Sequence, residues 1–241
     1  MKRKQSGFTL IEIAIVLVII GLLLGGVLKG QELINSAKVK NLATDFKNIP
    51  VFIYGYQDKF KALPGDDASA ATHAAGAIAC TPAATGRCAT GNGVIEGMWN
   101  AAAAVTDESA LFWQHARLAG LAPGPTALTD AGYIPTNAVG GAIGVQGGTS
   151  CTAASTPTAS CTAAFLTPVK DASGNALRGA YVVCSRAILG KFAKQLDTTL
   201  DDGNTATGSV LVVPDGSAAA TSATATGSID DAASYTVCMG V

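Results

Sequence analysis

The feature that most constrains this chain is an apolar stretch near its N-terminus. From Phe8 to Leu28 the only ionisable side chain is Glu12. About 20 apolar residues are enough for a helix to cross a bilayer, and a charged group deep in that bilayer costs roughly 2.5 to 3.5 kcal/mol. We therefore expect a membrane-spanning helix in which Glu12 has a partner that relieves this cost.

The residues around Glu12 follow a known pattern. The basic leader Lys2-Arg3-Lys4 is followed by Gly7, Phe8 and, four residues later, Glu12. This pattern resembles the class III signal of type IV pilins and pseudopilins. The resemblance implies that a prepilin peptidase cuts between Gly7 and Phe8 and methylates the new terminal amine. It also implies that Glu12 pairs with the Phe8 amine of a neighbouring subunit during assembly, which relieves the burial of both charges.

Two other interpretations of the same segment are weaker. An ordinary secretory signal has an apolar region of 7 to 15 residues with small residues at its cleavage site. Here the apolar run is longer, and the small residue Gly7 lies on the wrong side of it. A plain single-span anchor suits the length but gives no reason for Glu12. The basic leader predicts a cytoplasmic N-terminus and translocation of the rest of the chain.

Apolar residues continue at helical spacing beyond the membrane-length run. Steps of three and four separate Val39, Leu42, Phe46, Ile49, Ile53, Tyr56, Phe60 and Leu63. Such a stripe, with charged residues between its members, indicates an amphipathic helix that packs one face against a globular part. A helix from Phe8 to about Leu63 would be roughly 80 Å long at 1.5 Å per residue.

The rest of the sequence predicts a mixed head. Pro64-Gly65-Asp66 is a helix-stop signal, and residues 68–106 should be irregular. Further helices are expected over 106–121 and 185–200, with strands over 181–183, 210–213 and 235–237. Tracts 140–164 and 203–233 are rich in small residues and should be surface loops.

The predicted fold is therefore α+β. It resembles a pilin, with a long N-terminal helix whose hydrophobic half protrudes and whose amphipathic half packs on a small antiparallel sheet. The expected segments are a leader at 1–7, a membrane or filament-core helix at 8–28, an amphipathic helix at 29–63 and a disulfide-containing head at 64–241.

Further short segments resemble a widespread bacterial prepilin-like subfamily. They are Lys29–Lys38, Tyr56–Lys59, Ala62–Asp67, Gly91–Ile95, Phe112–His115, Ala119–Leu121 and Leu196–Gly203. The resemblance touches most of the chain, but it implies a filament subunit and little more.

All six cysteines lie in the part predicted to leave the cytoplasm, namely Cys80, Cys88, Cys151, Cys161, Cys184 and Cys238. An even count in an exported, loop-rich head indicates disulfides, although six cysteines allow 15 connectivities. The spacings suggest three pairs, 80 with 88, 151 with 161, and 184 with 238. The last pair resembles the cysteine-bounded C-terminal region of many pilins. Zinc is the rival interpretation, but the chain has two histidines and no CxxC spacing.

No cofactor is expected from the sequence, and calcium is the one ion for which it offers candidate ligands. The main candidates are the closely spaced oxygen donors Asp197, Asp201, Asp202 and Asn204, because calcium takes six to eight such ligands. Some type II secretion pseudopilins carry calcium in the head. The spacing is not that of an EF-hand, and acids after a helix commonly serve as caps and turns. Weaker candidates are Asp66, Asp67, Asn92 and Glu96.

The sequence does not predict an enzyme. Neither histidine has a nucleophile motif such as GxSxG nearby, and His115 is expected to be structural. No phosphate-binding glycine motif occurs, and no basic stripe predicts nucleic-acid binding. The expected function is a structural subunit of a type IV pilus or type II secretion filament. The alternative is a periplasmic interaction or adhesion module, anchored in the membrane, that does not polymerise.

The resemblance also implies partners and a location. The partners are copies of the chain or other pilins, the prepilin peptidase, a cytoplasmic assembly ATPase and an inner-membrane platform. The expected location is the bacterial inner membrane before assembly, and a periplasmic or extracellular filament afterwards.

Overall fold

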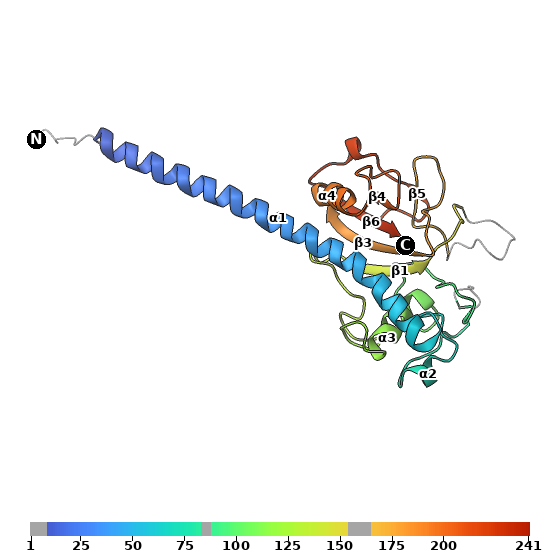
Figure 1. Cartoon of the computed structure of the whole chain (residues 1–241). Coiled ribbons are helices and arrows are strands. Elements are labelled where there is room, and N and C mark those ends of the chain that lie inside the picture. Colours follow the sequence, from blue (N-terminus) through green and yellow to red (C-terminus); the bar gives the residue numbers. More distant parts are fainter. Residues whose placement is uncertain (1–8, 83–87, 154–164) are drawn as a thin grey trace, which may run out of the picture. The chain divides into compact units, whose positions relative to one another are not determined.

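A computed structural model describes residues 9–82, 88–153 and 165–241 (Figure 1). The chain divides into two units, the first ending at Lys38 and the second running from Val39 to Val241. A 51-residue helix, α1 (Leu10–Phe60), contributes to both. The fold is α+β and pilin-like, with the long N-terminal helix packing on a small four-stranded antiparallel sheet.

In the first unit, α1 presents apolar side chains that nothing in the described chain covers. Leu10 is 93% exposed, and Leu17, Leu22 and Leu28 each remain more than half exposed. Within the described residues, α1 is the only helix that is long and apolar enough to cross a membrane. This matches the expectation drawn from the run without charges.

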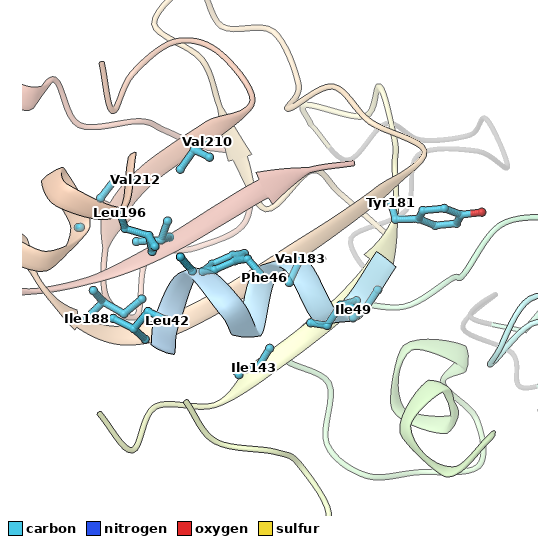
Figure 2. Packing of buried hydrophobic residues seen from close by; sticks show 14 of the residues in the cluster. Leu42, Phe46, Ile49, Ile143, Tyr181, Val183, Ile188, Leu196, Val210 and Val212 are labelled. Atoms are coloured by element: carbon cyan, nitrogen blue, oxygen red, sulfur yellow. The ribbon is translucent and has the colours of Figure 1, made fainter. Parts of the chain in front are cut away.

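In the second unit, the predicted stripe of α1 is buried. Its buried residues are Val39, Leu42, Ala43, Phe46, Ile49, Ile53 and Tyr56. Figure 2 shows members of this stripe packed with Ile143, Val183 and Ile188 of the sheet. The helix ends at Phe60 rather than Leu63, because Lys61 adopts a left-handed conformation (φ 56°) and its N–H bonds to the carbonyl of Gln57.

The main sheet has the strand order β1-β3-β6-β4, with every neighbouring pair antiparallel. Its strands are β1 (Ile143–Gly147), β3 (Tyr181–Leu189), β4 (Val210–Pro214) and β6 (Ser234–Gly240). A second, two-stranded parallel sheet pairs β2 (Val169–Lys170) with β5 (Thr221–Ser222).

Strand β1 corrects the prediction that residues 140–164 form a surface loop. All five of its residues are buried. The polar side chain of Gln146 is accommodated there because it accepts a hydrogen bond from the N–H of Trp99 and donates one to the carbonyl of Leu166. A buried strand can contain a glutamine when both ends of its amide have partners.

The remaining helices are short. They are α2 (Ala70–His73), α3 (Glu108–Leu118), α4 (Gly190–Leu200) and a 3₁₀ turn, η1 (Thr226–Ser228). The helix predicted over 185–200 begins only at Gly190, since residues 185–189 continue β3. The register of that strand shifts between Ser185 and Ile188, where Ala187 has a φ of 60°. A bulge of this kind bends a strand without ending it, so β3 pairs with β6 again at Ile188 and Leu189.

Candidate functional site

The N-terminal segment is the first candidate site, and its described part centres on Glu12. One carboxylate oxygen of Glu12 accepts hydrogen bonds from the N–H of Thr9 at 2.8 Å and from its hydroxyl at 2.7 Å. The Thr9 hydroxyl in turn accepts the N–H of Glu12 at 3.3 Å. This reciprocal arrangement is a capping box, which supplies partners for N–H groups that a helix start leaves unpaired. The predicted cleavage residues Gly7 and Phe8 lie outside the described residues.

After Glu12, the side chains along the helix are apolar and exposed. A basic leader precedes it in the sequence. Residues 2–28 match the prokaryotic N-terminal methylation motif. This motif is the signature of type IV pilins and pseudopilins. The chain therefore has the N-terminus of a pilin-like precursor, and the motif points to a structural protein rather than an enzyme.

The methylation motif implies, in general terms, processing by a prepilin peptidase and assembly into pilin polymers. Together with the apolar helix it fits membrane anchoring before assembly. Neither the curated proteins nor the solved structures gave a match to the chain.

Two disulfides cross-link this pilin-like head, one closing a short loop and the other joining two strands of the sheet. Cys80 is joined to Cys88, eight residues away, and Cys184 is joined to Cys238, 54 residues away. The second bond links residues that face each other across β3 and β6, and both cysteines are fully buried. These are two of the three pairs suggested by spacing. The third involves Cys161, which lies outside the described residues.

Several segments that are distant in sequence meet at the turn after α1. The N–H of Gly65 donates to Nδ1 of His115 at 2.9 Å, and Nε2 of that ring lies 2.8 Å from the carbonyl oxygen of Ile78. The ring is therefore neutral, with its proton on Nε2, and burial lowers its pKa. His115 is fully buried, and its contacts are those of a structural residue.

The two aspartates after Gly65 hold neighbouring segments. Asp66 accepts hydrogen bonds from the backbone N–H groups of residues 91–93. Asp67 accepts the hydroxyl of Tyr56 at 2.8 Å and lies 2.7 Å from Nδ1 of His73. Burial pushes the pKa of Asp67 upward, but hydrogen bonds from His73 and Tyr56 outweigh it and the pKa is lowered. Both acids thus have structural partners.

Glu108, at the start of α3, is a buried acid whose role the sequence analysis missed. Its two carboxylate oxygens accept the N–H groups of Ala89 and Glu96, each at 3.0 Å. Burial, with a smaller contribution from the Glu96 carboxyl, raises the pKa of Glu108 to about 9. In sequence, Glu108 looks like an ordinary first-turn acid, and only the path of residues 89–96 over α3 makes it a buried one.

Three of the four main calcium candidates come together at the end of α4. Carboxylate oxygens of Asp197, Asp201 and Asp202 all lie within 4.8 Å of one another. Asp197 is fully buried, and burial, followed by the neighbouring Asp202 and Asp201 charges, raises its pKa to about 7. Asn204 is engaged locally, because its amide oxygen accepts the N–H of Ala206 at 3.3 Å.

Proposed function

We propose that this chain is a structural subunit of a type IV pilus or type II secretion filament. In this proposal a prepilin peptidase removes residues 1–7, and the mature chain polymerises through residues 8 to about 30. A cytoplasmic ATPase and an inner-membrane platform drive assembly. Before assembly the subunit lies in the inner membrane with its N-terminus in the cytoplasm. After assembly it is part of a periplasmic or extracellular fibre.

The observation that carries the proposal is the single acid in the apolar segment that matches the methylation motif. Between residues 8 and 28 only Glu12 can be charged, and large apolar side chains surround it along the exposed helix. A bundle of such helices buries the apolar surface, but it also buries the carboxylate, which requires a positive partner. The methylated amine of a neighbouring Phe8 supplies that charge without adding a basic residue to the helix.

One observation favours a second candidate, a membrane-anchored module that does not polymerise. Glu12 already has partners within its own chain, the N–H and hydroxyl of Thr9. Capping the helix start explains a glutamate at this position with no neighbouring subunit. The two candidates differ in what they need from Glu12, since assembly needs its charge and capping needs only an acceptor oxygen.

Glu12→Gln and Thr9→Ala separate these needs. Glutamine can still act as acceptor in a capping box but carries no charge, whereas Thr9→Ala removes the hydroxyl and keeps the charge. Loss of one partner of a buried pair costs about 3–5 kcal/mol. We therefore expect Glu12→Gln to be cut and inserted normally while its fibre yield falls about 100-fold or more. Thr9→Ala should still assemble.

The measurement is the amount of sheared surface fibre, seen by electron microscopy and immunoblot. Mass spectrometry of the fibre subunit should find a methylated Phe8 as its first residue. If Glu12→Gln yields normal fibres, or if the wild-type chain is processed and forms none, the polymer function is wrong and the anchored module replaces it.

A further inference from the structure

The end of α4 holds an acidic group that its own chain does not satisfy. Neither carboxylate oxygen of Asp197 has a hydrogen-bond partner among the described residues, and the side chain is fully buried. The backbone N–H of Gly203 lies near enough to lower the pKa of this carboxyl, but its geometry falls short of a hydrogen bond. Buried polar groups almost always have partners, so an orphaned carboxylate requires an explanation.

The nearest charged neighbours of Asp197 are two further acids. Asp201 and Asp202 bring their own carboxylate oxygens within 4.8 Å of it and of each other. No lysine, arginine or histidine within the described residues forms a salt bridge with any of the three. Three acids so close together repel one another unless a cation or protons lie between them.

We propose that Asp197, Asp201 and Asp202 bind a calcium ion. Asp197 supplies a ligand from the buried side, while Asp201 is partly exposed and Asp202 is exposed. The group therefore has a closed floor and a side open to solvent, through which a hydrated ion can enter. This inference is independent of the proposed filament function.

Backbone contacts fix the loop that carries two of the acids. One oxygen of Asp201 accepts the N–H groups of Ser209 and Val210 at the start of β4. Gly208 lies so close to the same carboxylate that a Cβ atom there would collide with it. Asp202 accepts the N–H of Asn204 at 2.8 Å. These contacts hold the carboxylates beside Asp197 before any ion arrives, so binding requires little rearrangement.

The ligand chemistry selects calcium among common cations. All three side chains offer hard carboxylate oxygens, which favour calcium and magnesium over zinc or copper. Calcium tolerates irregular geometry and takes carboxylates through one or both oxygens, whereas magnesium demands a near-ideal octahedron and keeps several waters. A compact group of three carboxylates with one exposed member suits the more adaptable ion.

A proton is the competing occupant. If Asp197 is simply neutral, it can share its proton with a neighbouring carboxylate, and no ion is needed. The two occupants respond differently to added calcium, because an ion that binds only the folded head raises its melting temperature.

The test uses the full-length chain, purified in detergent with a chelator and then titrated with calcium chloride. Calorimetry should detect one site, with a Kd of roughly 0.1 to 1 mM, as for extracellular calcium modules. If Kd is about 0.1 mM, 10 mM calcium should raise the melting temperature by about 5–10 °C. Asp197→Asn should abolish the shift. The control Asp130→Asn, which removes an equal charge from an exposed site, should retain it.

Asp202→Asn provides a second variant in case Asp197→Asn does not fold. It changes an exposed residue and should weaken calcium binding at least tenfold without unfolding the head. Absence of binding at 10 mM calcium overturns the proposal, as does an unchanged calcium response in folded Asp197→Asn or in Asp202→Asn. An equal response to magnesium overturns the assignment to calcium.

Discussion

Gly65 permits a close approach that no other residue allows, so Gly65→Ala should destabilise the head strongly. Its φ is +94°, and an added Cβ would collide with the backbone carbonyl of Glu108. The N–H of Gly65 itself is also the donor to Nδ1 of His115. The substitution therefore strains the backbone, pushes α3 away from the turn and weakens a buried hydrogen bond.

The magnitude follows from these three effects. A left-handed conformation costs a residue with a side chain about 1–2 kcal/mol, overpacking a rigid contact about 1–3 kcal/mol, and a weakened hydrogen bond about 1 kcal/mol. Gly65→Ala should thus lower the free energy of unfolding by about 4 kcal/mol, which is roughly 8–16 °C in melting temperature for a domain of this size.

Gly76→Ala is the matched control. Gly76 has nearly the same backbone conformation (φ +88°), but no heavy atom lies within 4 Å of the position of its Cβ. It should cost strain alone, about 1.5 kcal/mol, or roughly 3–6 °C. Thermal unfolding can be followed by tryptophan fluorescence of the full-length protein in detergent, because Trp99 and Trp113 both lie in the second unit. Equal losses in the two variants would refute the close-approach argument.

Two further predictions concern the disulfides and pH. Replacing Cys184 and Cys238 with alanine should cost about 4 kcal/mol, against about 2.5 kcal/mol for the shorter Cys80–Cys88 loop; equal losses in denaturation midpoint would contradict the loop-entropy estimate. The pKa of Glu108 is about 9 in the folded head, and its ordinary value is near 4.5. Between pH 4.5 and 9, the Glu108 carboxyl is therefore ionised in the unfolded chain but protonated in the folded one. Stability should therefore fall as pH rises above 4.5, by about 3 kcal/mol at pH 7, and Glu108→Gln should show a shallower decline in melting temperature between pH 5 and 7.5; parallel curves would disprove this.

The parts of the fold that were predictable have strong periodic signals. The stripe from Val39 to Tyr56 repeats at three and four residues, and a helix is the only element that places such residues on one face. The strands over 181–183, 210–213 and 235–237 are marked by β-branched and aromatic residues. In each case a local pattern and the tertiary packing favour the same structure.

The parts that were missed depend on contacts distant in sequence. Strand β1 contains Gly144 and Gln146, which carry no strand signal, and it forms because Trp99 and β3 provide partners. The burial of Glu108 depends on residues 89–96. The calcium candidates are recognisable in the sequence as closely spaced acids, but only the structure shows that Asp197 is fully buried and has no hydrogen-bond partner within the described residues. Tertiary context decides each of these positions, and local propensity cannot report it.

The position of β6 sets the order in which this head can mature. It lies between β3 and β4 but follows both in the chain. Before residues 234–240 are synthesised, β3 and β4 both lack the strand that pairs with them in the finished sheet. Cys184 likewise lacks its disulfide partner, which lies 54 residues downstream. A folding catalyst or chaperone that acts before then would therefore bind a head whose sheet lacks β6 and whose Cys184 thiol has not yet formed its disulfide with Cys238. Both defects end when β6 joins the sheet.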